Sequence, residues 1–179
     1  MASNLFASLL LIVLLSVAIS INADKALINK TCMKTHFYKL CVKTLESDPL
    51  SVKASDARGL AVNMVHFGVA RASGILNFLN YTLRSPEVAK NVTLQNTCKY
   101  CAGKYVTAIR SLRSSNQEID KKNVPGAQKL LGKVMKSMEA CRHKFNVNHV
   151  TVYPVELVHK EKKLTRIVAV TRSIVAKLA

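Results

Sequence analysis

LQNTCKYCAGKYVTAIRSL, which occupies residues 94–112, carries the clearest periodic pattern in the chain. Its apolar and half-apolar side chains recur at alternating steps of four and three residues, the spacing that lines them up along one face of an α-helix. The residues of this seam are Leu94, Cys98, Cys101, Tyr105, Ala108 and Leu112. The stretch is therefore predicted to be a helix that packs along a single seam.

A second stretch repeats the alternation and also turns a cysteine toward its neighbours. Its seam consists of Ala127, Leu131, Val134, Met138, Cys141 and Phe145. Packed helix axes lie about 8–10 Å apart and each Cα stands about 2.3 Å from its axis, which leaves a gap close to the roughly 4.4–6.8 Å that a disulfide spans. A disulfide from Cys141 is therefore feasible, but this geometry permits either Cys98 or Cys101 as the partner.

Residues 5–21 form an apolar run near the start of the chain, followed by Asn22, Ala23 and Asp24. A short apolar run that ends at a small residue predicts a secretory signal peptide over residues 1–23, with Ser20 as a second cleavage site. The alternative is an N-terminal membrane anchor, because the run is close to the lower length limit for a bilayer span. We expect residues 24–179 to be the mature domain, without stable membrane insertion after cleavage.

The formal net charge is +17, and residues 1–23 contain no charged side chain, so the mature domain carries all of it. Such a charge favours acidic partners through attraction that salt weakens. The basic residues are scattered rather than interleaved with aromatic residues, which argues against a nucleic-acid face. An anionic polysaccharide or an acidic enzyme is the expected partner, and a merely soluble cationic surface is the alternative.

Secretion also determines how the five cysteines are interpreted, since an oxidising compartment favours disulfides over metal sites and an odd number leaves one over. Asn29, Asn80 and Asn91 each begin an Asn-x-Thr glycosylation sequon. Asn91 lies on the extrapolated seam of the Cys98 helix, so it is the sequon least expected to be accessible.

The remaining segments predict further helices. Residues 24–50, with Cys32 and Cys41 nine residues apart, are predicted to form a stapled helical hairpin, and such a clip is worth about 2–3 kcal/mol in the loop-entropy model. Ser55 is the predicted N-cap of a long helix, with Asp56 in its first turn. The predicted seam of that helix is Val62, Val65, Val69, Ala72, Leu76, Leu79 and Leu83. The larger side chains off this seam, which either lie under the hairpin or form a protein-binding patch, are Met64, Phe67, Phe78 and Tyr81.

Ser85 and Pro86 are predicted to restart the chain as the helix that leads into residues 94–112, and residues 123–126 separate it from the Cys141 helix. Residues 146–154 are interpreted as a connector, and residues 155–178 as a last helix. The face of this last helix consists of Leu164, Ile167, Thr171, Ile174 and Leu178. These segments predict an all-α protein, an antiparallel up-down four-helix bundle over residues 55–179 with the disulfide-stapled hairpin as an N-terminal extension.

A search for catalytic chemistry finds no convincing set. Cys98 and Cys101 have the C-x-x-C spacing of a redox motif but lie in mid-helix, whereas a reactive thiolate needs an exposed, electropositive helix N-terminus. The histidines are spread out and assemble no zinc ligand set; they are His36, His66, His143, His149 and His159. The ten acidic residues, Glu161 among them, are placed mostly at helix ends or on outer faces. We therefore expect a binding protein without a cofactor or metal, and not an enzyme.

Specific motifs resemble those of the plant invertase and pectin methylesterase inhibitor family. The N-terminal part of the resemblance comprises Thr31, Cys32, Thr35, Tyr38, residues 41–45 and residues 47–49. Cys101 with Tyr105 and Ala108 is similar to the family's C-x-x-x-Y-x-x-A motif. Cys141 with Phe145 resembles its fourth cysteine and the Phe that follows.

The resemblance implies a four-helix bundle with an N-terminal hairpin, disulfides Cys32–Cys41 and Cys101–Cys141, and Cys98 as the free thiol. It implies reversible inhibition of an enzyme in a one-to-one complex, in the apoplast or cell wall, with the vacuole as an alternative. Acidic pectin becomes a second expected partner through the positive charge. The competing function is a cationic wall-binding helical protein without an enzyme target.

The two branches of the family differ in their target. Invertase inhibitors often carry Pro-Lys-Phe between the third and fourth cysteines, whereas this chain has KKNVP at residues 121–125, so pectin methylesterase is favoured over acid invertase. The chain departs from the family pattern at Tyr153, where Ser precedes Pro154 in relatives, and at His159, where Asn is usual.

In esterase inhibitors the bundle is expected to cover the enzyme's active-site cleft with polar residues of its second and third helices. The predicted interface residues, which face away from the seam, are Lys99, Gly103, Thr107 and Arg110. The alternative for these residues is an ordinary solvated helix face.

Overall fold

The computed structural model describes residues 25–147 and 153–178, and every regular element in these residues is helical. Residues 25–32 form the first helix. The later helices are α2 (Tyr38–Glu46), α3 (Pro49–Val52), α4 (Ala57–Thr82), α5 (Pro86–Ala89), α6 (Val92–Asp120), α7 (Val124–Val147) and α8 (Val155–Val175). The predicted signal peptide lies outside the described residues.

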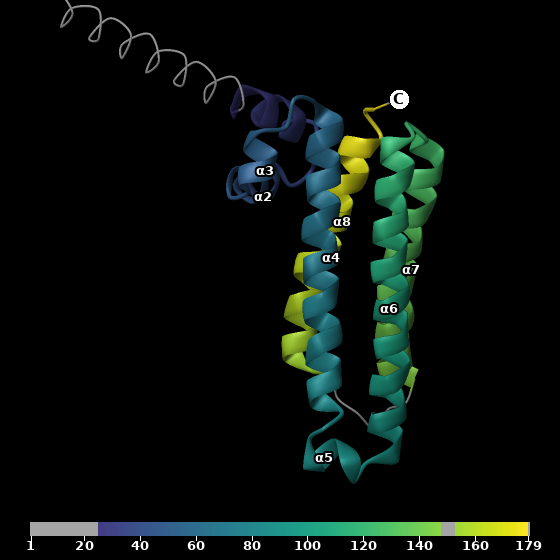
Figure 1. The fold of residues 1–179 in the computed structure, drawn as a ribbon. Helices are drawn as coiled ribbons and strands as arrows, with labels where there is room; N and C mark the ends of the chain where they lie inside the picture. Colours follow the sequence, from purple (N-terminus) through teal and green to yellow (C-terminus); the bar gives the residue numbers. More distant parts are fainter. Residues whose placement is uncertain (1–24, 148–152, 179) are drawn as a thin grey trace, which may run out of the picture.

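Helices α4, α6, α7 and α8 run side by side as an antiparallel four-helix bundle, which confirms the predicted architecture (Figure 1). The packed pairs are α4 with α6, α6 with α7, α7 with α8, and α8 with α4, so the bundle closes and α6 lies diagonally across from α8. The short helices α2 and α3 pack on α4 at the end of the bundle where α4 begins.

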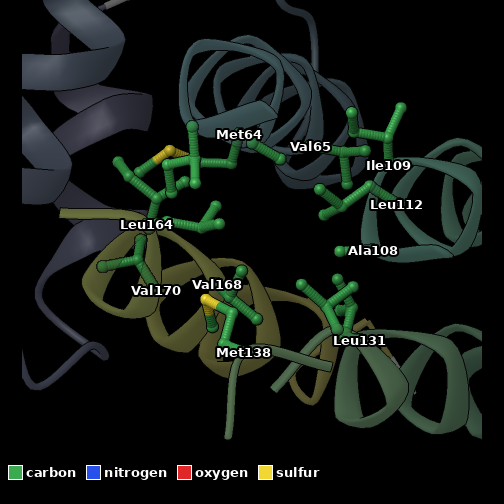
Figure 2. Close-up of a cluster of buried hydrophobic side chains, with 14 of the residues drawn as sticks. Met64, Val65, Ala108, Ile109, Leu112, Leu131, Met138, Leu164, Val168 and Val170 are labelled. Atoms are coloured by element: carbon green, nitrogen blue, oxygen red, sulfur yellow. The ribbon is translucent and has the colours of Figure 1, made fainter. Parts of the chain in front are cut away.

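All four long helices contribute to the core (Figure 2). The side chains labelled there are Met64, Val65, Ala108, Ile109, Leu112, Leu131, Met138, Leu164, Val168 and Val170. The two seams predicted for α6 and α7 are buried along their whole length, except that Leu94 is half-buried. In both helices the apolar residues recur with the period of an α-helix, so the residues predicted for the seam are the residues that are buried.

The seam predicted for α4 is partly wrong. The residues that α4 buries are Leu60, Ala61, Asn63, Met64, Val65, Gly68, Ala72, Ile75 and Leu79. Val62, Val69, Leu76 and Leu83 are only half-buried. Because α4 contacts the hairpin helices α2 and α3 as well as α6 and α8, its buried face is broader than one seam and is rotated toward Met64 and Gly68.

Gly68 marks the close approach of α4 to α6. A Cβ at this position would lie 3.1 Å from Cδ2 of Leu112. The large side chains predicted off the α4 seam do not gather in one place. Met64 is fully buried and Tyr81 is 77% exposed, so these side chains form no common patch. Among the described helices, α4 alone is long and apolar enough to span a membrane, and its buried face, which includes Leu60, Met64 and Ile75, packs in the bundle core.

Two helix starts differ from the prediction. Asp56, not Ser55, caps α4, and its Oδ1 accepts a hydrogen bond from the backbone N–H of Gly59 at 2.8 Å. Ser85 and Pro86 start α5 as predicted, but α5 ends at Ala89. Asn91 then caps α6, with Oδ1 accepting from the N–H of Leu94 at 3.0 Å, so the prediction of one continuous helix from Ser85 is wrong. Short side chains with an acceptor oxygen compete for helix starts, and only the backbone path selects among them.

The N-terminal hairpin is held by its own disulfide and by contacts with the bundle. Cys32 and Cys41 are bonded, with their Cα atoms 5.6 Å apart. The side chains that the hairpin buries with them are Ile28 and Leu45. Asp48 caps α3 by accepting from the N–H groups of Leu50 and Ser51, which turns the chain toward α4.

Candidate functional site

The predicted interface residues lie on the outer side of α6. Lys99, Gly103 and Arg110 are exposed and Thr107 is half-buried. They follow one another at steps of four, four and three residues on the side opposite the buried seam, so they form a line along the helix. We call Lys99, Gly103, Thr107 and Arg110 the α6 ridge.

Two of these side chains are bonded within their own helix. Lys99 Nζ donates to Oε1 of Gln95 at 3.1 Å, and Thr107 Oγ1 donates to the backbone oxygen of Gly103 at 3.1 Å. The ridge therefore has a positively charged side chain at each end, Lys99 and Arg110, and only the small residues Gly103 and Thr107 between these two charges. Such a surface can approach a partner's backbone closely and offers donors rather than nucleophiles.

Tyr100 lies next to the ridge, on the side that faces α7. The ring is 39% exposed, with Nζ of Lys104 at 4.8 Å from its centroid and Nζ of Lys144 on α7 at 5.8 Å. Each cation–π contact at an exposed site is worth about 0.5–1 kcal/mol. The neighbouring faces of α6 and α7 are therefore joined into one basic surface.

A disulfide fixes α6 to α7 behind the ridge. The structure pairs Cys101 with Cys141, with their Cα atoms 4.8 Å apart, and leaves Cys98 buried with a free thiol. Burial raises the pKa of the Cys98 thiol, which disfavours the reactive thiolate. The C-x-x-C spacing therefore joins one half-cystine to one inert thiol rather than forming a redox pair.

A buried acidic residue links three helices, although the acidic residues were expected to lie mostly at helix ends or on outer faces. Glu161 on α8 is 1% exposed. Its Oε1 accepts a hydrogen bond from the Tyr105 hydroxyl of α6 at 2.5 Å, and its Oε2 accepts from Nη2 of Arg142 on α7 at 3.3 Å. Glu161 is therefore an exception to the expectation that the acidic residues lie mostly at helix ends or on outer faces. Its position four residues after Leu157 and three before Leu164 was the available signal, because both neighbours are buried.

The cluster around Glu161 has the character of a structural link. Burial raises the pKa of Tyr105, and the negative charge of Glu161 raises it further, so its hydroxyl stays a hydrogen-bond donor. Burial also raises the pKa of Tyr153, whose ring meets Phe145 edge-on with the centroids 4.9 Å apart. One carboxylate with an Arg and two protonated Tyr residues provides no acid and base pair near neutral pH.

The other predicted site residues are dispersed. Among the described residues, no group of three or more His, Cys, Asp or Glu side chains gathers to hold a metal ion, and His149 lies outside them. Asn80 is exposed on α4, whereas Asn29 is half-buried and accepts from the Tyr38 hydroxyl at 3.0 Å. Asn91 is half-buried and caps the start of α6. It therefore does not lie on the α6 seam, where it was predicted to lie.

The sequence of this chain is similar to those of known proteins. Residues 26–174 match the family described as "Plant invertase/pectin methylesterase inhibitor". The chain is 33% identical to the Arabidopsis thaliana protein "Cell wall / vacuolar inhibitor of fructosidase 2" over 99% of both chains. It is 30% identical to "Pectinesterase inhibitor 28" of Oryza sativa subsp. japonica over 86% of this chain and 69% of that protein.

Solved structures agree with the fold. A mutant form of a pectin methylesterase inhibitor from Arabidopsis superposes with a TM-score of 0.64 at 18% identity, covering 83% of this chain and 94% of that one. A helical bundle with two disulfides and these relatives define a proteinaceous enzyme inhibitor rather than an enzyme. The chain belongs to the plant invertase/pectin methylesterase inhibitor family.

Proposed function

We propose that this protein inhibits a pectin methylesterase by laying the α6 ridge and the adjoining face of α7 over the enzyme's active-site cleft. The observation that carries the proposal is the ridge itself, in which Lys99 and Arg110 are exposed on one line with only small side chains between them. In a one-to-one complex, such a ridge blocks the polymer substrate without performing chemistry.

The support behind the ridge makes α6 and α7 a rigid binding surface. The Cys101–Cys141 disulfide and the Tyr105–Glu161–Arg142 contacts hold both helices from the core side. A surface that is already ordered loses little conformational entropy on binding, which favours affinity. The positive charges at both ends of the ridge would orient it over an acidic cleft.

Acid invertase is the second candidate target. The relative named as a fructosidase inhibitor matches over 99% of both chains, which favours this target. The turn between α6 and α7 argues against it, since residues 121–125 read KKNVP and lack the Pro-Lys-Phe motif of many invertase inhibitors. For location, we propose secretion to the cell wall after removal of residues 1–23, with the vacuole as the alternative; the wall and vacuole named for the Arabidopsis relative support this.

A paired inhibition assay tests the proposal. The mature oxidised domain from Asp24 onward is titrated against a plant pectin methylesterase and an acid invertase, together with the variant Lys99→Glu/Arg110→Glu. We expect stoichiometric loss of esterase activity with the native chain and an inhibition constant at least about 30-fold higher with the variant, the size of a hot-spot loss of about 2 kcal/mol.

The matched control is Lys162→Glu/Lys163→Glu, which makes the same change in net charge on exposed positions of α8, diagonally across the bundle from α6. An equal loss of inhibition in both variants would show that net charge matters and the ridge does not. Inhibition of invertase alone would establish the second target, and inhibition of neither enzyme would favour the wall-binding alternative.

A further inference from the structure

A groove separate from the core runs between α4 and α6, which lie side by side in Figure 1. It consists of two adjoining hollows of about 460 Å³ and 490 Å³ that share Arg113 and Gln117 of α6. On α4 the lining residues include His66 and Asn77, which are eleven residue steps and hence about 16 Å apart along the helix. It is long and open rather than a closed pocket for a compact molecule.

The charged side chains that line the groove are all positive. Arg110 and Arg113 line it together with the imidazole of His66, and the described residues that line it include no Asp or Glu. Both guanidinium groups lack an ion-pair partner among the described residues. Two unpaired guanidinium groups on one wall match a ligand that carries carboxylates at intervals, because each guanidinium binds a carboxylate through two parallel hydrogen bonds.

The groove also contains an unsatisfied polar atom. Oδ1 of Asn116 is buried without a hydrogen-bond partner among the described residues, while Nδ2 of the same side chain lies 3.4 Å from Nε2 of His66. Buried amide oxygens in folded proteins almost always accept a hydrogen bond. A hydroxyl donor in the groove would provide the missing partner.

Apolar side chains lie between these polar groups. Leu76 and Val69 of α4 and Val106 of α6 form part of the lining. A ligand that fits must therefore offer an apolar face as well as hydroxyls and carboxylates. A pyranose ring with a carboxylate has all three, since its C–H groups form one face and its hydroxyls project from the edge.

We propose that the groove between α4 and α6 binds an oligosaccharide of uronate sugars in an extended form. An acidic peptide fits less well, because both walls are α-helices whose backbone groups are already bonded internally. The amide groups of an extended peptide would find no backbone partners there, unlike at a sheet edge. The oligosaccharide would bind without any bond being made or broken. This proposal does not depend on whether the inhibitor's target is an esterase.

Direct binding in the absence of any enzyme tests the proposal. The mature oxidised chain is titrated calorimetrically with an oligogalacturonate about four sugars long, the length that matches about 16 Å of helix. The variant is Arg113→Gln, which removes the guanidinium shared by both hollows. The matched control is Lys163→Gln, which removes one exposed charge on α8.

We expect the dissociation constant to rise at least about tenfold for Arg113→Gln and less than about twofold for Lys163→Gln, with tenfold corresponding to 1.4 kcal/mol. The fully methyl-esterified oligosaccharide of the same length should bind at least tenfold more weakly than the free acid, since it offers no carboxylate to the guanidinium groups. Amide chemical-shift changes should map to residues 66–77 and 106–117.

Three results would overturn the proposal. Equal weakening by the two substitutions would indicate diffuse attraction to the cationic surface, and equal affinity for a glutamate-rich peptide of the same charge would indicate a peptide site. No heat and no shift change at low salt would mean that the groove takes no uronate. Circular dichroism of Arg113→Gln checks its fold, and its inhibition of the esterase, measured separately, distinguishes failure of this proposal from failure of the proposed function.

Discussion

Glu161 shows how one residue can hold three helices together. Its two carboxylate oxygens bind Tyr105 of α6 and Arg142 of α7, while its own backbone belongs to α8. The arginine is about half exposed, with its side chain at 52% accessibility, and the carboxylate is at 2%. Water cannot reach the buried Glu161 carboxylate, so this carboxylate depends on the hydrogen bond from the Tyr105 hydroxyl.

Removing that hydroxyl should destabilise the fold. Tyr105→Phe keeps the buried ring but leaves Oε1 of Glu161 without its donor, so we expect the free energy of unfolding to fall by about 1.5–3 kcal/mol, the range for hydrogen bonds to charged groups. Urea denaturation at pH 7 measures it. Tyr100→Phe is the control, since this exposed residue of the same helix should change stability by less than about 0.5 kcal/mol. Equal effects would contradict the structural role of the Tyr105 hydroxyl.

The raised pKa of Tyr105 also predicts a dependence on alkaline pH. Above the ordinary tyrosine pKa of about 10, the unfolded chain loses this proton while the folded chain keeps it, so stability falls with rising pH. The slope approaches about 1.4 kcal/mol per pH unit once the unfolded tyrosine is fully deprotonated, and it is half of that at pH 10. The stability difference between the native chain and Tyr105→Phe should therefore narrow by about 1 kcal/mol between pH 10 and 11. Parallel curves for the two proteins would contradict the assignment.

The turn between α6 and α7 shows how an element ends. The N–H of Lys122 donates to the oxygen of Ile119 at 3.0 Å, and the N–H of Asn123 donates to the oxygen of Glu118 at 2.8 Å. These two bonds form a Schellman motif, which requires a left-handed residue at its centre. Lys122 is that residue, with φ at 61°, although glycine is the usual choice there.

Glycine at this position should therefore stabilise the protein. We expect Lys122→Gly to raise the free energy of unfolding by about 0.5–1 kcal/mol, because the relief of about 1–2 kcal/mol of left-handed strain exceeds the added freedom of the unfolded chain. Lys121→Gly removes the same charge one residue earlier, where φ is −75°, and should lower stability. Thermal unfolding of both variants measures the difference, and a loss for Lys122→Gly would contradict it.

The whole molecule carries far more positive charge than it pairs. Its net charge is +17, and the described residues contain three ion pairs. The outer side of α7 shows the consequence, since Lys129, Lys133 and Lys136 are exposed at helical spacing and form no ion pair among the described residues. Like charges at such spacing repel one another along the helix.

Neutralising this row should stabilise the protein at low salt only. We expect Lys129→Gln/Lys133→Gln/Lys136→Gln to raise the free energy of unfolding by about 0.5–1 kcal/mol at 0.01 M salt, from two repulsive neighbour pairs and the field of the other charges. The gain should disappear at 1 M salt, where the screening length is about 3 Å. Urea denaturation at both salt concentrations measures it. A gain that persists at high salt would indicate a change in helix propensity instead.

The sequence alone determined the helices whose apolar residues recur along one regular seam and that pack mainly on other bundle helices. In α6 and α7 the apolar spacing is regular, so residues 94–112 and 127–145 predicted both the helices and their buried faces. It also placed the α6 ridge, because the side opposite a seam follows from the helical period. Helical periodicity is local, and it can be read without knowing the neighbouring helices.

Only the tertiary structure decided what depends on neighbours from elsewhere in the chain. The rotation of the α4 face follows from contact with the hairpin helices α2 and α3 as well as with α6 and α8. The burial of Glu161 follows from Tyr105 and Arg142, which lie 56 and 19 residues away. From the residues alone, Cys98 and Cys101 were equal partners for Cys141, because they lie on the same seam. The position of α7 along α6 selects Cys101, and that position is set by the packing of the whole bundle.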